Sequence, residues 1–157
     1  MLVIADSSAL VALATCDALD VLVQIYEDVR APTAVYDEVA VPEKPQGVVL
    51  ATFLAGRVVS VDMSRWIVAA GGLGRGGLEA MALYKQLSAD ALLIDDHRAR
   101  AVAEQNQIVC IGVLGILLLA KHKAVIHKIK PYVDELRSSP LHYGEALLAK
   151  ALSLADE

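Results

Sequence analysis

The chain has 157 residues, a length typical of one domain, and we expect a single domain over residues 1–157. Hydrophobic residues make up 56% of the chain and aromatic residues only 4%, so Leu, Val, Ile and Ala must build the core. The net charge of −5 has the wrong sign for simple electrostatic adhesion to nucleic acid. The longest apolar run, residues 108–120, is shorter than the about 20 residues of a membrane-spanning helix. No positive charge precedes the apolar N-terminus, as one would in a secretory signal, so we expect a cytoplasmic protein with no membrane segment.

Predicted strands and helices alternate along the chain. Short aliphatic runs predict strands at residues 2–6, 57–61, 91–94 and 108–111. Helices are predicted at residues 9–13, 18–26, 33–39, 48–54, 78–87, 97–105, 114–121, 126–136 and 144–154. Pro32 is expected to open the third of these helices, because its missing N–H has no partner at a helix start, and Gly56 to stop the fourth. The alternation predicts an α/β fold, a three-layer αβα sandwich with a central parallel sheet.

Acidic residues follow the predicted strands, where parallel sheets place their binding sites. Asp6 ends the first strand, and Asp95 and Asp96 end the third. Glu38 lies on the helix after Pro32, and Glu79 lies at the start of the helix after a glycine-rich segment, residues 69–77. If these carboxylates converge, a Mg²⁺ or Mn²⁺ ion would offset their mutual repulsion.

Each acid also has a purely structural interpretation. Asp6, Asp95 and Asp96 each precede a helix and are suitable N-caps. Glu38 is compatible with a solvated helix face, and Glu79 in a first turn would complement the helix dipole.

The positive charge is concentrated in residues 97–130, where six Lys and Arg residues face one acid, a net charge of +5. This stretch is either an ordinary solvated surface or a contribution to substrate binding. Cys16 and Cys110 lack any metal-binding spacing and are expected to be reduced packing residues. His97 and the other three histidines are expected at the surface.

Five stretches, in order, resemble the PIN-domain superfamily, and most closely its VapC-toxin-like branch, the DUF3368 group. They read IADSSALVAL, APTAVYDEV, GGLEAMAL, LLIDD and IGVLGILLLAK, and the resemblance extends from residue 2 to about residue 137.

This resemblance implies a metal-dependent ribonuclease that uses one or two Mg²⁺ or Mn²⁺ ions to hydrolyse phosphodiester bonds. It assigns metal binding to Asp6, Glu38 and Asp96, with Asp95 close by. Glu79 joins the first three as a catalytic acid. Ser8, Arg75 and Arg98 are the expected substrate contacts, with Ser8 assisting Asp6.

One position departs from the family pattern. Relatives usually read Gly-Glu-x-Glu-Ala where this chain has Gly76 to Ala80, so Gly77 stands in place of an acid. Two residues along a helix correspond to about 200° of rotation, so Glu79 cannot simply replace that acid. Either Glu79 completes the site, or the site is one carboxylate short and its metal binding or catalysis is weakened.

Three functions therefore compete. The first is an endoribonuclease acting on RNA, the toxin of a toxin–antitoxin pair, with an antitoxin protein and a homodimer as family expectations. The second is a catalytically weakened PIN-fold module that binds protein or RNA. The third is nucleotide binding by the glycine segment, which lacks the full dinucleotide spacing and any Gly-Lys-Ser/Thr.

Overall fold

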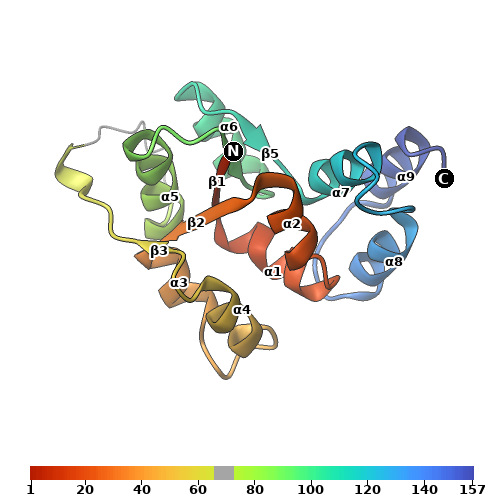
Figure 1. Ribbon diagram of the computed structural model, residues 1–157, viewed down its shortest axis with the longest axis horizontal. Coiled ribbons are helices and arrows are strands. Elements are labelled where there is room, and N and C mark those ends of the chain that lie inside the picture. The colour runs from red at the N-terminus through yellow and green to blue at the C-terminus, as the bar shows by residue number, and fades with distance from the viewer. Residues whose placement is uncertain (66–72) are drawn as a thin grey trace.

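The computed structural model describes residues 1–65 and 73–157 and is organised around one parallel sheet (Figure 1). Its five strands are ordered β3-β2-β1-β4-β5. They are β1 (Leu2–Ala5), β2 (Asp28–Pro32), β3 (Val58–Val59), β4 (Ala91–Leu93) and β5 (Cys110–Ile111). The chain builds outward from β1 to β3 and then returns to place β4 on the other side of β1, so the strand order reverses between β1 and β4. Binding sites in such sheets form at the carboxyl ends of the strands at this reversal.

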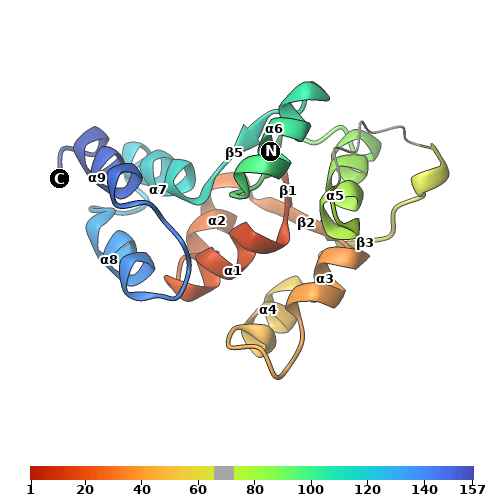
Figure 2. The ribbon, with the colours of Figure 1, turned by 180° about the vertical axis from the view of Figure 1, so that it is seen from behind.

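Helices cover both faces of the sheet. Those among the described residues are α1 (Ser7–Thr15), α2 (Leu19–Tyr26), α3 (Thr33–Val39), α4 (Gly47–Leu54), α5 (Arg75–Gln86), α6 (His97–Gln105), α7 (Val113–His122), α8 (Lys130–Ser138) and α9 (Glu145–Leu154), with a short 3₁₀ turn at Met63–Arg65. Helices α7, α8 and α9 gather at one end of the molecule, and α5 lies at the other (Figures 1 and 2).

Side chains of β1 alternate between two hydrophobic cores, as the period of a strand requires. Val3 and Ala5 pack into the larger core, with residues of α1, α2 and α7. Ile4 points to the opposite face and packs into the smaller core, with residues of α5 and α6. The sheet is therefore buried on both sides, and the three-layer αβα sandwich predicted from the sequence is confirmed.

Strand β2 was not predicted. Its sequence, DVRAP, carries two charges and a proline, which weaken the strand pattern. In the fold these charges pair with each other, because Arg30 Nε donates to Asp28 Oδ1 at 2.8 Å. Pro32 ends this strand and is the N-cap of α3, with an extended backbone (ψ 161°), so its predicted place as the first helical residue is wrong by one position.

Several helix boundaries also differ from those predicted. Helix α5 begins at Arg75, three residues before the predicted start, so Gly76 and Gly77 are helical; the part of the glycine-rich segment up to Gly72 lies outside the described residues. Helix α8 begins at Lys130, four residues later than predicted. Gly56 follows α4 with φ +78°, which confirms its role as the helix stop.

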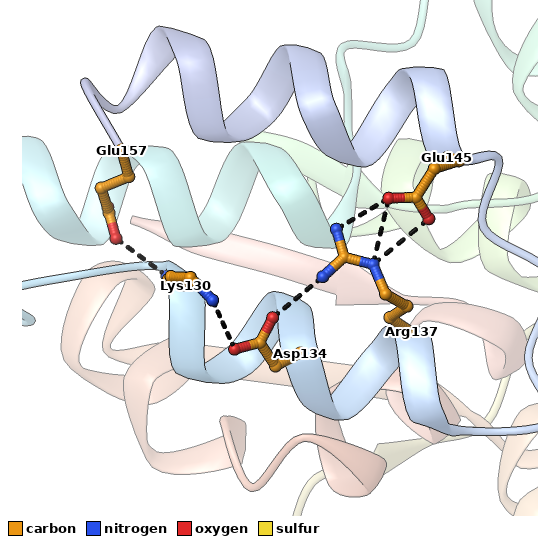
Figure 3. A network of polar contacts seen from close by, with 5 residues as sticks. All are labelled: Lys130, Asp134, Arg137, Glu145 and Glu157. Atoms are coloured by element: carbon orange, nitrogen blue, oxygen red, sulfur yellow. Dashed lines mark hydrogen bonds and ion pairs between the residues drawn. The ribbon is translucent and has the colours of Figure 1, made fainter.

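Ion pairs fasten the last two helices to each other. The Arg137 guanidinium bridges Asp134, at 2.9 Å, and Glu145, at 2.9 Å (Figure 3). The Glu157 carboxylate accepts the backbone N–H groups of Ile129 and Lys130 at 2.9 and 3.0 Å, which caps the start of α8. These contacts hold the segment between α8 and α9 in place.

No single helix in the described part of the chain is long and apolar enough to cross a membrane. Helices α1 and α2 meet that criterion of length and composition only as a pair, and they are bent by 118°.

Candidate active site

A cleft of about 590 Å³ lies at the carboxyl ends of β1 and β4, at the reversal in strand order. The loop after β1, the first turn of α1, the acidic end of α3 and the start of α5 form its walls. Its acidic lining residues are Asp6, Asp37, Glu38 and Asp96. Three of the four predicted catalytic acids therefore share one cleft.

Asp6 is the most buried acid of this cleft, with 7% of its surface exposed. It occupies the N-cap position of α1, yet its side chain makes no capping hydrogen bond, so the helix-cap interpretation of this carboxylate is wrong. Burial raises the pKa of Asp6, and the negative charges of Glu38 and Asp96 raise it further, against a lowering by the Ser7 backbone N–H. The ionised form of Asp6 is therefore disfavoured mainly by burial and to a smaller extent by the two neighbouring carboxylates.

Glu38 is held in the cleft by a serine that the sequence analysis did not single out. The Ser7 hydroxyl donates to Glu38 Oε2 at 2.6 Å. Gly76 makes room for this pair, because a Cβ at that position would stand 3.1 Å from Glu38 Oε2 and 3.7 Å from Ser7 Oγ. Asp37, which the sequence pattern did not single out, also lines the cleft.

Asp96 is both a helix cap and a cleft residue. Its Oδ1 accepts the backbone N–H groups of Arg98 and Ala99 at 2.9 and 3.3 Å, which starts α6. The second oxygen, Oδ2, takes no part in this cap. The two interpretations of Asp96 offered by the sequence are therefore compatible.

Asp95 lies elsewhere than predicted. Its Oδ1 accepts the backbone N–H of Val113 at 2.8 Å and so caps α7, and its Oδ2 accepts a short hydrogen bond from the Tyr143 hydroxyl. With both of its oxygens engaged, Asp95 is not among the residues that line this cleft. Burial raises the pKa of Tyr143, and the charge of Asp95 raises it further.

Glu79 also differs from the prediction, since it does not line the cleft. It is buried, with 5% of its surface exposed. Its Oε1 accepts the backbone N–H of Ala34 at 3.2 Å, in the first turn of α3, and its Oε2 pairs with Arg75 Nε at 2.7 Å. Glu79 thus caps the helix that carries Glu38, and this contact gives it a structural role.

Gly77, by contrast, lines the cleft. A Cβ at this position would meet only Leu73, at 3.5 and 3.7 Å, which is ordinary contact. The helix therefore presents position 77, and not position 79, to the cleft, as the 200° rotation between them requires.

The predicted substrate contacts fall into two groups. Ser8 is exposed, and Ser8 and Arg75 both line the cleft. Arg98 is exposed on α6 but is not a lining residue. Three of the six cations of the basic stretch form ion pairs: Arg100 with Glu104, Lys121 with Glu157 and Lys130 with Asp134. The four histidines are exposed, as predicted.

Asp6, Glu38 and Asp96 offer oxygen ligands that suit Mg²⁺ or Mn²⁺. Burial is the main cause of the raised pKa of Asp6, and the repulsion from Glu38 and Asp96 that adds to it is the part that a cation would relieve. Among residues 1–65 and 73–157, however, no three His, Cys, Asp or Glu side chains form a group that would hold a metal ion in this arrangement. The three acids thus fit a divalent cation by the chemistry of their oxygens, whereas their positions in this structure do not form a metal-binding group.

Comparison with known protein families matches residues 2–157 to the family DUF3368, described as a PIN domain. Comparisons with curated proteins and with solved structures found no significant match. The match covers nearly the whole chain and agrees with the parallel αβα architecture and with the acids at its strand ends. The chain therefore belongs to the DUF3368 family of PIN domains, a fold whose members are generally nucleases.

Proposed function

We propose that this protein is a metal-dependent endoribonuclease that hydrolyses RNA phosphodiester bonds. The observation that carries the proposal is the cleft in which Asp6, Glu38 and Asp96 gather, with the pKa of Asp6 raised by burial and by the two other carboxylates. Repelling carboxylates of this kind are stabilised when a cation binds between them.

The cation, Mg²⁺ or Mn²⁺, would be held by Asp6, Asp96 and Glu38. When bound, it would activate water and stabilise the leaving oxygen of the phosphodiester. This ion would also supply the positive charge that an RNA phosphate needs in an acidic cleft of a chain with net charge −5.

The residues of the chain orient these groups. The Ser7 hydroxyl fixes Glu38 Oε2 toward the cleft, and Glu79 anchors the start of the helix that carries Glu38. Because Asp96 Oδ1 accepts two backbone N–H groups, Oδ2 is the oxygen that would bind the cation. Ser8 and Arg75, which both line the cleft, would donate hydrogen bonds to phosphate oxygens.

Incubation of the protein with single-stranded RNA and Mn²⁺ tests this proposal, with Asp6→Asn as the inactive variant. Asp20→Asn is the matched control, because Asp20 is an exposed acid on α2 outside the cleft. We expect the wild type and Asp20→Asn to cleave equally and Asp6→Asn to lose at least about a hundredfold in rate, as removal of a key electrostatic group does. Equal cleavage by all three would rule out this site.

The second candidate is a PIN-fold module that binds RNA or protein without cleaving it. The observation in its favour is Gly77, which lines the cleft where relatives carry an acid, while Glu79 is engaged in capping α3. Calorimetric titration with Mn²⁺ separates the two candidates. Absence of Mn²⁺ binding favours the module, and binding that Asp6→Asn removes favours the nuclease.

The biological role that we propose is that of the toxin in a toxin–antitoxin pair, acting in the cytoplasm as a homodimer and neutralised by an antitoxin protein. The family resemblance is the support for this role. A small upstream reading frame that encodes a DNA-binding protein, and whose product blocks RNA cleavage, is the expected observation.

A further inference from the structure

A second cleft, of about 970 Å³, adjoins the acidic one. It lies between the start of α6, the turn from β5 into α7, and the segment that leads into α9. Ser8 and Asp96 line both clefts, so the two are continuous across these residues. A ligand that reaches Asp96 in the first cleft is therefore at the entrance of the second.

The walls of the second cleft combine apolar surface with hydrogen-bond donors. Its apolar wall residues include Ile111, Leu114, Leu141, Tyr143 and Leu147. Three further lining side chains are His97, Arg100 and His142. Flat apolar surface beside nitrogen donors is the composition that accommodates a nucleobase and its phosphate.

The floor of this cleft is kept open by glycine. Gly112 and Gly115 line it, and a Cβ on Gly112 would stand 2.8 Å from Asp95 Oδ1 and 3.5 Å from Arg100 Nη1. The Arg100 guanidinium thus extends over the floor, while its Nε pairs with Glu104 at 3.2 Å.

The outer wall is fixed in place without a ligand. The Tyr143 hydroxyl donates to Asp95, which is itself bonded to the start of α7. On the other side of the segment between α8 and α9, Arg137 pairs with Glu145 (Figure 3). Because these contacts already hold the wall in one conformation, binding of a ligand costs little conformational entropy in the wall.

We propose that the second cleft is a subsite for single-stranded RNA, in which a base next to the cleaved phosphate stacks against the wall formed by Leu141, Tyr143 and Leu147. This proposal rests on the proposed function, since continuity with the acidic cleft identifies the occupant. The hydrogen bonds from the Val113 N–H and the Tyr143 hydroxyl offset part of the negative charge of Asp95, and Arg100 and the two histidines are the groups that would bind an RNA phosphate.

Anisotropy of a fluorescein-labelled octauridylate, measured in EDTA so that binding is followed without cleavage, tests the subsite. The variant is Leu147→Glu, which puts a charge into the cleft at a half-exposed position (52% exposed) and leaves the core intact. Leu154→Glu is the matched control, because Leu154 lies on the same helix, is 65% exposed and does not line the cleft.

We expect Leu147→Glu to weaken binding of the octauridylate by about fivefold or more, the loss of one stacked base, and Leu154→Glu to change it less than about twofold. His142→Ala should weaken binding and His122→Ala should not, since only His142 lines the cleft.

Equal affinities of the two Leu→Glu variants for the octauridylate would overturn the subsite, and cleavage of RNA by the wild type in Mn²⁺ would then leave the nuclease proposal standing. A selective effect of Leu147→Glu in a protein that does not cleave RNA would support the subsite and refute the nuclease. Absence of any RNA binding by the wild type in EDTA would overturn the subsite, and absence of RNA cleavage in Mn²⁺ as well would overturn the nuclease proposal.

Discussion

Replacement of Glu79 separates a structural from a catalytic role for this acid. Glu79 is 5% exposed, caps the first turn of α3 through Ala34 N–H and pairs with Arg75. Glu79→Ala removes all of these contacts. Glu79→Gln keeps an amide oxygen that accepts the Ala34 N–H and loses only the charge.

The expected magnitudes follow from these contacts. Loss of a helix cap costs about 1 kcal/mol. The ion pair contributes at most about 1 kcal/mol, because the Arg75 side chain is 78% exposed and water screens it. The space left by the buried side chain adds about 1 kcal/mol. Glu79→Ala should therefore lower the free energy of unfolding by about 2–3 kcal/mol, and Glu79→Gln by about 1 kcal/mol.

Urea unfolding measures these differences, and thermal unfolding should show Tm lowered by about 4–12 °C for Glu79→Ala, at about 2–4 °C per kcal/mol for a chain of this size. RNA cleavage is then assayed at a temperature at which every variant is folded. We expect Glu79→Gln to retain most of the wild-type rate. A Glu79→Gln variant with wild-type stability and no cleavage would show that the charge of Glu79 acts in catalysis.

Three further predictions concern the cleft and its border. Gly77→Glu adds a carboxylate to the cleft, and the added Cβ makes only ordinary contacts, so we expect the variant to fold like the wild type. Calorimetry should show several-fold tighter binding of Mn²⁺ to this variant. Weaker Mn²⁺ binding would show that the cleft does not lack an acid. In EDTA, Asp6→Asn should have a higher Tm than the wild type at pH 7. Burial raises the pKa of Asp6 in the folded protein above its ordinary value of 3.8, so the wild type loses stability as the pH rises from 3.8 through the folded-state pKa. The Tm difference should therefore vanish toward pH 3.8. A Tm difference that does not depend on pH would contradict this prediction. Gly112→Ala places a Cβ 2.8 Å from Asp95 Oδ1 and should lower Tm by several degrees, whereas Gly74→Ala, with nothing within 4 Å, should leave it unchanged.

The order of layers and the main acids of the site were predictable because they depend on local sequence. Aliphatic runs of strand length, each followed by a polar residue and a helix, predict a parallel sheet, and the residues after such strands lie at its carboxyl edge. Asp6 and Asp96 needed no further information. Strand β2 was missed because its charges and proline are tolerated only through the Arg30–Asp28 pair and its place beside β1 and β3.

The tertiary structure alone decided which acids face the cleft. The Ser7–Glu38 hydrogen bond joins residues 31 apart, and the Tyr143–Asp95 bond joins residues 48 apart, so neither has a local pattern. The rotation of α5 about its own axis decided the positions of Gly77 and Glu79. Its start at Arg75 and its packing direct Gly77 to the cleft and Glu79 to the N-terminus of α3, about 200° away. The sequence determined that carboxylates meet at this edge of the sheet, and the packing of α3, α5 and α7 determined which of them remain available to bind a ligand.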